Sequence, residues 1–188
     1  MRRGAFFCGV ASLATCVPSP ARAMRTIRLA VVVIADASIS NEQSARVYAR
    51  LSRGLLREER FAILDQLRTE AILREAANAS SGIAQRSIAV GRRLHADRLV
   101  RLQIALDASD SNGAFVSTHR EDAQITYDVI DTHSGVIRAS GTASGSAERS
   151  RSGSGSGESV MIVRRDALDA ATDDLLDKLT APGVFGNE

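Results

Sequence analysis

One block of the chain, residues 61–106, constrains the fold most because it switches twice between two hydrophobic periods. An apolar run at 61–64 precedes two segments, 65–78 and 83–95, whose apolar residues recur every three or four positions. Residues 98–106 then alternate, with Val100, Leu102, Ile104 and Leu106 on one side and Arg101 and Gln103 on the other. The longer period predicts amphipathic helices, and the period of two predicts a half-buried strand. The block therefore predicts strand, helix, helix, strand.

The N-terminal neighbour of this block adds a strand and a helix. Residues 28–35 form a continuous β-branched run, which is typical of a strand covered on both faces. Ser40 followed by Gln43 predicts a capping box that starts a helix. Inward positions are expected at Ala45, Tyr48, Leu51 and Leu55 of this helix, at Leu67, Ala71 and Ile72 of the next, and at Ile83, Ser87, Val90 and Leu94 of the third. Arg46, Arg50, Arg53 and Arg57 form either a solvated helix face or a phosphate or lipid patch.

The C-terminal half predicts a polar loop, two more strands and a last helix. Residues 107–118 are polar and contain Asn112-Gly113, a tight-turn pair. Residues 123–129 alternate, 131–135 turn the chain, and 136–139 return antiparallel. The Ser/Gly-rich stretch 144–159 is expected to be a flexible loop. A helix with Leu168, Ala171, Leu175 and Leu179 inward follows, and Pro182-Gly183 ends it before a tail at 183–188.

Together these segments predict an α/β fold of order β-α-β-α-α-β-β-β-α. About five strands would form one mixed sheet in a single three-layer-like domain at residues 24–182. The first 23 residues are typical of a signal peptide, with Arg2 and Arg3 before an apolar run and Ala21-Arg22-Ala23 at the cleavage site. The apolar run is shorter than the roughly 20 residues of a spanning helix. Cleavage after Ala23 is expected; the alternative is a lipobox-like signal that would lipidate Cys16.

Removing this leader changes the charge and the cysteine content. The chain has 24 Lys+Arg and 22 Asp+Glu, a formal net charge of +2. Without Arg2, Arg3 and Arg22 the charge becomes −1, so the basic pI gives no reason to expect nucleic-acid binding. Cys8 and Cys16 both lie in the leader, which leaves a thiol-free domain without disulfides or Cys–metal sites.

No pattern of catalytic or metal-binding residues stands out in the mature chain. His95, His119 and His133 fit no compact metal motif. His119 with Glu121 and Asp122 forms either a metal cluster or, on the favoured interpretation, a solvated charged edge. Asp36 and Asp97 either pair as carboxylates at a sheet edge or act as helix caps and strand ends. GSGSG at 153–157 has the spelling of a nucleophile elbow but lacks its strand–helix context. We expect no enzyme activity, cofactor or metal.

Several pieces of this order resemble the CsgG/LpoB-like family of bacterial envelope proteins, related to TolB N-terminal-like domains. They are an Ile-Ala-Val-rich strand at 29–34, a strand-to-helix segment at 61–75, a Gly-x-x-Leu-x-Ala-Asp step at 91–97 and a Val-Asp-x-x-Thr-Gly-like hairpin at 129–137. The resemblance spans about 29–179. Asp65-Gln66 stands where the family has Glu-Arg, and His95 stands where members often have Gly.

The resemblance implies a role in assembling or regulating envelope machinery. The expected function is that of an exported, non-enzymatic module that docks on a protein partner, as LpoB-like regulators dock on peptidoglycan synthases. The alternative is an oligomeric component of an outer-membrane secretion or assembly apparatus resembling CsgG. Pore hairpins are not expected, because 107–123 is too short and polar and 144–159 has no apolar alternation.

The expected location is the periplasm, with an outer-membrane lipoprotein facing the periplasm as the alternative if Cys16 is lipidated. Membrane contact is expected only in that case, nucleic acid is not an expected partner, and a homo-oligomer stays open. Arg92, Arg93 and Arg101 are weak candidates for the partner surface, and ordinary solubility is the alternative explanation for them.

Overall fold

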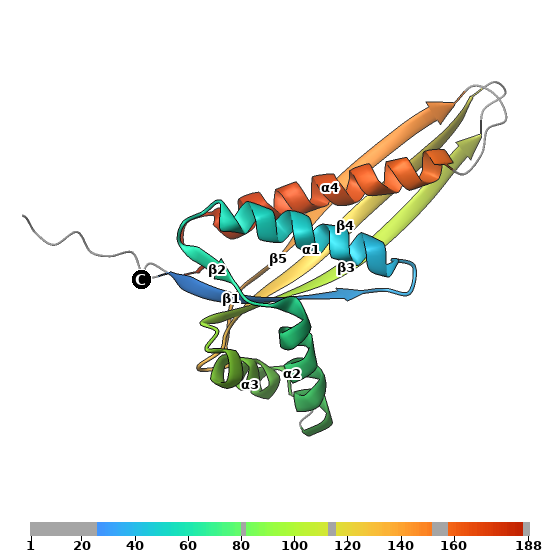
Figure 1. Cartoon of the computed structure of the whole chain (residues 1–188). Helices are drawn as coiled ribbons and strands as arrows, with labels where there is room; N and C mark the ends of the chain where they lie inside the picture. The colour runs from blue at the N-terminus through green and yellow to red at the C-terminus, as the bar shows by residue number, and fades with distance from the viewer. Residues whose placement is uncertain (1–25, 80–81, 113–115, 152–157, 186–188) are drawn as a thin grey trace, which may run out of the picture.

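A computed structural model of the chain describes residues 26–79, 82–112, 116–151 and 158–185. Its elements follow the predicted order: β1 (Ile27–Ala35), α1 (Asn41–Leu56), β2 (Phe61–Ile63), α2 (Gln66–Ala79), α3 (Ile83–Leu94), β3 (Arg98–Asn112), β4 (Ser117–Asp131), β5 (Ile137–Arg151) and α4 (Glu158–Thr180). The strands form one sheet in the order β2-β1-β3-β4-β5 (Figure 1). β1 runs parallel to β2 and β3, and β3, β4 and β5 are antiparallel. The predicted mixed α/β fold is confirmed.

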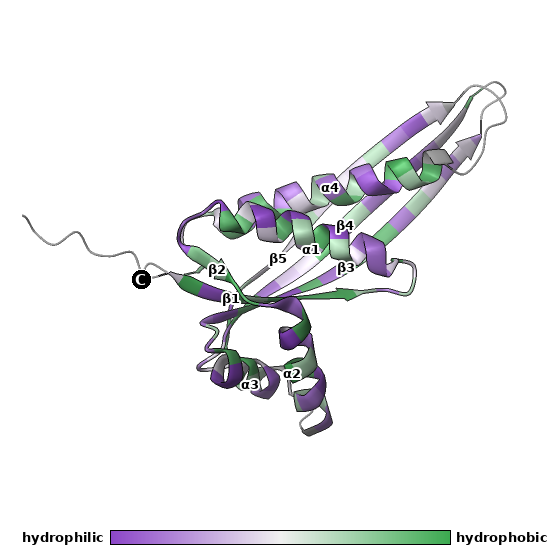
Figure 2. Cartoon of the chain, in the orientation of Figure 1, coloured by the Kyte–Doolittle hydropathy of each residue, from purple (hydrophilic) through white to green (hydrophobic). Residues whose placement is uncertain are grey.

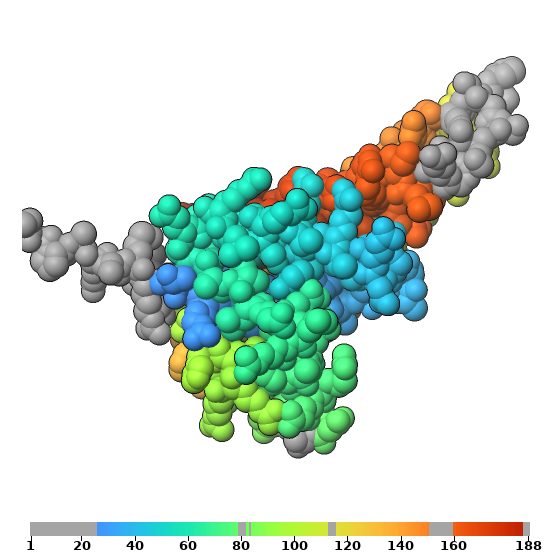
Figure 3. Space-filling view, in the orientation of Figure 1, coloured from blue at the N-terminus to red at the C-terminus, as the bar shows by residue number. Residues whose placement is uncertain are grey.

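Helices lie on both faces of this sheet and give three layers. α1 and α4 pack side by side on one face (Figures 1 and 3). Beneath them lies the larger core, in which Leu51 and Leu168 from the helices meet Leu102, Ile104 and Ile125 from the strands, all fully buried. α2 and α3 cover the other face over a smaller core around Ala30, Leu99 and Ile130. β1 supplies both cores, as its continuous apolar run predicts.

The inward faces of two helices differ from the sequence prediction. α1 starts with the expected capping box of Ser40 and Gln43 and buries Leu51 and Leu55, but Val47 is buried where Ala45 was expected. In α2, Ile72 is buried, whereas Leu67 is 77% exposed and Ala71 is exposed. Thr69 takes the inward place, because its hydroxyl donates to the Asp65 carbonyl and so needs no water.

The other two helices agree with the prediction. α3 buries Ser87, Val90 and Leu94, and the side chain of Ile83 lies outside the described residues. α4 fully buries all four predicted positions, Leu168, Ala171, Leu175 and Leu179.

Half of the arginine row on α1 pairs with α4 rather than facing water alone. Arg46 donates from Nε and Nη2 to Asp169 at 3.0 and 2.7 Å, and Arg50 binds Asp173 in the same forked way at 2.8 and 2.6 Å. Arg53 and Arg57 are exposed, as predicted. Arg46 and Arg50 therefore link α1 to α4 as partly exposed ion pairs rather than forming a row of free cations.

Residues 144–151 correct the prediction of a flexible loop, because they belong to β5. The small residues Ala143, Gly145 and Ala147 face α4, while Ser144 and Ser146 face water. A Cβ added to Gly145 would lie 2.2 Å from the Ala171 nitrogen and 2.5 Å from the Ala167 oxygen, so α4 rests directly on this strand. Residues 152–157 of the predicted loop lie outside the described part, and α4 begins at Glu158.

The connection between β3 and β4 also differs, because residues predicted as a polar loop extend both strands. Pairing continues from Asp107↔Asp122 to Asn112↔Ser117. Backbone hydrogen bonds sustain a hairpin without apolar side chains, which explains why hydrophobic alternation missed it. Figure 2 shows hydrophilic and pale colours toward this distal end of the sheet, while β1 is mostly hydrophobic. Gly113, of the predicted turn pair, lies outside the described residues.

The predicted turn at 131–135 is confirmed, with Gly135 at φ 72° and its N–H donating to the Asp131 carbonyl at 2.7 Å. The predicted tail, by contrast, joins the core. Phe185 is 3% exposed and its ring meets that of Phe61 at 4.8 Å and 61°. Within the described residues, no helix is both long and apolar enough to cross a membrane.

Candidate functional site

The distal part of the sheet has one face that none of the described helices covers, and we call it the open face. α2 and α3 pack over the row Ala30–Leu99–Ile130, and beyond the next row, in which Val32 and Asp128 are still buried, the side chains on that face reach solvent. Its side chains are Val32 and Ile34 of β1, Arg101, Gln103, Ala105 and Asp107 of β3, Asp122, Gln124, Thr126 and Asp128 of β4, and Ser140, Thr142, Ser144 and Ser146 of β5. Those of β4 and β5 are all polar, so this part of the face offers a dense array of hydrogen-bonding groups, while Ile34 adds one exposed apolar side chain at its β1 margin.

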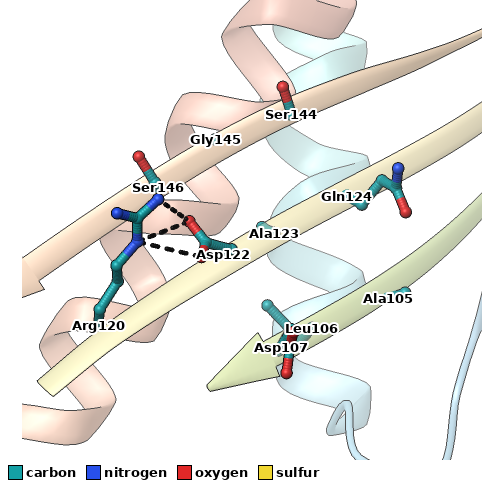
Figure 4. Close-up of a pocket in the computed structure, with 10 residues that line it drawn as sticks. All are labelled: Ala105, Leu106, Asp107, Arg120, Asp122, Ala123, Gln124, Ser144, Gly145 and Ser146. Carbon is teal, nitrogen blue, oxygen red and sulfur yellow. Dashed lines mark hydrogen bonds and ion pairs between the residues drawn. The ribbon is translucent and has the colours of Figure 1, made fainter. Parts of the chain in front are cut away.

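A shallow hollow of about 550 Å³ lies on this face (Figure 4). It is lined by Ala105, Leu106, Asp107, Arg120, Asp122, Ala123, Gln124, Ser144, Gly145 and Ser146. Figure 4 shows α1 and α4 passing behind the three strands, on the opposite side from this surface. The hollow is wide and polar, which suits a protruding side chain or loop better than an apolar small molecule.

Charges gather at the distal end of the hollow. Asp107 and Asp122 occupy directly opposite positions on β3 and β4. Arg120 donates from Nε and Nη2 to the Asp122 carboxylate at 3.0 to 3.1 Å. Like charges at opposite positions repel, and Arg120 compensates one of the two carboxylates. The end of the hollow therefore keeps a negative character.

Arg101, one of the three predicted partner-surface residues, lies on the open face. Its Nε donates to Asp128 Oδ2 at 3.0 Å, and its Nη2 contacts the same oxygen. The side chain of Arg101 is 35% exposed and that of Asp128 is 13% exposed. The guanidinium therefore takes part in the surface as half of an ion pair rather than as a free cation.

Arg92 and Arg93, the other two, lie in the last turn of α3 and not on the open face. Arg93 forms a forked ion pair with Glu75 of α2, and the hydrogen bond from Arg93 lowers the pKa of that carboxyl. Arg92 is exposed. Both cations also suit the negative end of the helix dipole. The structure thus gives Arg93 a role in holding α2 to α3, and it does not bring the three predicted residues together.

A buried charge cluster at the distal end was missed by the sequence analysis. Glu121 is fully buried, and its Oε1 accepts from Arg164 of α4 at 2.8 and 3.1 Å and lies 3.3 Å from His119 Nε2. His119 also binds Asp110 through Nδ1, and this hydrogen bond raises the pKa of the imidazole. The predicted solvated edge is therefore wrong for Glu121, which links β4 to α4, while His119 extends the cluster to Asp110 of β3. Asp122 points to the opposite, open face.

A second charge cluster fixes the proximal end of the sheet. Arg98 and Asp131 are each 9% exposed and meet at 3.0 Å. Burial alone would raise the pKa of Asp131, but hydrogen bonds from Ser134 and His133 and the charge of Arg98 outweigh it and lower the pKa to about 2. An Asp at the end of a strand and before a turn, as at Asp131, could have been recognised from the sequence. Its buried partner Arg98 could not, because it lies 33 positions earlier in the chain.

The proposed carboxylate pair of Asp36 and Asp97 does not form. Asp36 follows the C-terminal end of β1, and Asp97 precedes the N-terminal end of the parallel strand β3, so they lie at opposite ends of the sheet. Asp97 instead accepts a hydrogen bond from the Arg28 N–H at 2.8 Å. Across the described ranges, no group of three or more His, Cys, Asp or Glu is arranged to hold a metal ion. Cys16 and the cleavage site after Ala23 lie outside these ranges.

Comparison with known proteins supports the fold and leaves the family open. No family model matches the chain, and no curated protein matches it. A neuraminyllactose-binding hemagglutinin homolog from Helicobacter pylori has a similar structure, with a TM-score of 0.51, 10% identity and coverage of 85% of this chain and 87% of that one.

Two further structures resemble the chain more loosely. Lipoprotein GNA1162 from Neisseria meningitidis has a TM-score of 0.43 and 16% identity, covering 73% of this chain and 92% of that one. The LpoB C-terminal domain from Salmonella enterica has a TM-score of 0.39 and 13% identity, covering 66% and 85%. Bacterial lipoproteins and an LpoB domain are thus among the similar structures, and the likeness to CsgG stays a prediction.

Proposed function

We propose that the chain is an exported, non-enzymatic docking module of the bacterial cell envelope, whose open face binds a protein partner. The observation that carries the proposal is the uncovered distal half of the sheet, in a domain whose helices cover both faces elsewhere. The open face presents hydroxyl, amide and charged groups on three neighbouring strands. Interfaces between proteins that also exist apart are about as polar as ordinary surface, so this composition fits a reversible partner.

The rigidity of the open face supports the same role. β3 and β4 are paired over 15 positions, and α4 presses on the back of β5 at Gly145. Side chains held on a supported sheet lose little conformational freedom when a partner binds, and this lowers the cost of association. Glu121 and Arg164 add a buried link between the strands and α4 behind the hollow.

The partner class follows from the predicted leader and from the likeness to the LpoB domain. We propose a periplasmic envelope protein such as a peptidoglycan synthase, with the chain either free in the periplasm or held at the outer membrane through Cys16. A direct check is to add the purified chain to a peptidoglycan synthase from the same cell and to measure glycan polymerisation. An LpoB-like activator raises the rate, and an unchanged rate removes this partner class.

The docking role is tested by a matched pair of substitutions. Gln124→Arg places a long cation at the centre of the open face, and Gln85→Arg makes the same change at an exposed position of α3. The tagged chain is used to capture proteins from envelope extracts, and the captured partner is identified by mass spectrometry. We expect Gln124→Arg to lose the partner and Gln85→Arg to retain it.

Two outcomes would contradict the proposal. Equal capture by both variants would show that the open face is not the interface, and loss with Gln85→Arg alone would place the interface on α3. The thermal unfolding of both variants serves as the control for folding. In the alternative role, as an oligomeric assembly component, light scattering would give the mass of a closed ring for the unmodified chain.

A further inference from the structure

The outer edge of β5 is the starting point for a second interaction surface. β5 is an edge strand of 15 residues, whereas the opposite edge strand, β2, has three. An edge strand presents unpaired N–H and C=O groups that template pairing with another strand, and natural proteins cover or interrupt such edges. Proline, which would remove a pairing N–H, is absent from β5.

Two hydrogen bonds from α4 fix which backbone groups point outward. The Ser144 N–H donates to Asp174 Oδ2 at 2.9 Å, and the Thr142 carbonyl accepts from Lys178 Nζ at 2.7 Å. Backbone groups of alternate residues point to the same side of a strand, and the register with β4 is regular from 143 to 151. The backbone groups of Ser146, Glu148 and Ser150 therefore also point outward.

α4 covers this edge only at its centre, because the helix crosses the sheet diagonally. Near the end of the helix, Lys178 reaches the edge at Thr142 and Asp174 reaches it at Ser144. Ala167 and Ala171 lie over Gly145. Arg164, nearer the start of the helix, binds Glu121 of β4. Toward the distal end the helix has thus moved from β5 to β4. No hydrogen bond to the outward groups of Ser146, Glu148 or Ser150 is found among the described residues.

We propose that the distal half of β5 pairs with β5 of a second copy of this chain, antiparallel and about a two-fold axis through Ala147. The inference is independent of the docking role of the open face. In this register Ser146 of one copy lies opposite Glu148 of the partner subunit, and four backbone hydrogen bonds form between the two copies. The short β2 cannot receive β5, so the contact closes on itself as an isologous dimer.

The charged side chains of β5, and the hydrogen bond that already occupies the Ser144 N–H, favour this register. An axis through Glu148 places two carboxylates opposite each other, and an axis through Arg149 places two guanidinium groups opposite each other, which is destabilising. An axis through Ser146 requires the Ser144 N–H, which Asp174 already holds. With the axis at Ala147, Arg149 lies opposite Gly145 of the partner subunit, close to the edge position that the acidic Asp174 occupies. Arg149 is exposed and has no ion pair within the described ranges.

Disulfide trapping tests both the contact and its register. In the full chain carrying Cys8→Ser and Cys16→Ser, Ala147→Cys places a thiol on the axis, where opposite Cα atoms lie about 4.5 Å apart in a non-hydrogen-bonded pair. Ala139→Cys, on the same face of β5 and equally half-buried, is the matched control. Mild oxidation should give a disulfide dimer from Ala147→Cys and none from Ala139→Cys. Equal yields at the two positions, or no dimer from either, would overturn the proposal.

Adding Glu148→Pro to the Ala147→Cys chain tests the role of the outward N–H. Proline removes that N–H and leaves the β4 ladder intact, because Glu148 does not bond β4 through it. We expect Glu148→Pro to lose the cross-linked dimer and Glu148→Ala to keep it. Retention of the dimer with Glu148→Pro would contradict strand pairing. If Glu148→Pro fails to fold, the comparison of Ala147→Cys with Ala139→Cys still tests the contact. The two proposals fail separately: a chain that forms the Ala147→Cys dimer but captures no envelope partner would refute only the docking role.

Discussion

Adding a single methyl group at Gly145 should destabilise the fold, because α4 lies directly on that backbone. The new Cβ of Gly145→Ala would meet the Ala171 nitrogen at 2.2 Å, the Ala167 oxygen at 2.5 Å and the Ala170 carbonyl carbon at 2.8 Å. All three are backbone atoms of a regular helix, so the clash cannot be relieved by turning a side chain. Relief requires α4 to move away from β5, or β5 to bend.

The expected loss follows from two opposing effects. Overpacking of a closely fitted interior costs about 1–3 kcal/mol, and backbone contacts place this position near 3 kcal/mol. Replacing glycine within a strand returns about 0.5–1 kcal/mol. The free energy of unfolding should therefore fall by about 2 kcal/mol. For a domain of this size that corresponds to a decrease in Tm of about 4–8 °C.

Thermal and urea unfolding of Gly145→Ala and Ser146→Ala would check this value. Ser146 is the next residue of the same strand and faces solvent, so its substitution should change stability by less than about 0.5 kcal/mol. If residues 144–151 were a flexible loop, both substitutions would be nearly neutral. A Gly145→Ala chain as stable as the unmodified protein would refute the close packing of α4 on β5.

Three further changes probe the charge clusters. Hydrogen bonding to Asp110 raises the pKa of His119 above 6.5 in the folded protein. The stability that His119 contributes is therefore present below pH 6.5 and is lost as pH rises through this raised pKa. His119→Ala should flatten the curve of stability against pH above pH 6.5. The pKa of Asp131 is lowered from 3.8 to about 2, so its contribution is present above pH 3.8 and is lost as pH falls toward 2. Asp131→Asn should cost about 2 kcal/mol at neutral pH in urea unfolding, because each unit of lowered pKa corresponds to about 1.4 kcal/mol of stabilisation of the charged form. Arg46→Ala should cost less than about 1 kcal/mol by the same assay, since exposed ion pairs are weak, and a larger loss would show that this pair does more than link α1 to α4.

The sequence predicted the order of the elements because the buried strands and helices carry strong periodic patterns. Residues 28–35 are apolar without interruption, and Leu168, Ala171, Leu175 and Leu179 recur at helical spacing. Such patterns depend on local burial, which the chain itself records. The capping box at Ser40 and the turn at Asp131 were predictable for a related reason, since both involve residues three or four positions apart.

The distal hairpin and the later part of β5, after the predicted strand at 136–139, were missed because these segments are not held by large apolar residues. In β5 the alternation is present, but it runs between small residues such as Ala143 and Gly145 and polar ones such as Ser144. Flexible linkers have the same composition, and the Ser/Gly-rich stretch therefore predicted a flexible loop. The close approach of α4 that makes glycine necessary is a tertiary contact, and no local pattern records it.

The candidate surface was predictable only in part. Arg101 was correctly placed on the polar side of its strand, but its pairing with Asp128 depends on the register of β3 and β4. The hollow is formed by residues of three strands, and all three of those strands were predicted too short. Glu121 was assigned to a wet edge because its partner Arg164 lies on α4, beyond the reach of any local pattern.

The central claim is that a protein partner binds the open face, and site-specific photo-cross-linking in the living envelope tests it most directly. A photoreactive residue would replace Gln124 at the centre of the open face or Gln85 on the exposed side of α3. We expect a covalent adduct with one envelope protein from position 124 and none from position 85. Adducts from position 85 with none from position 124 would contradict it.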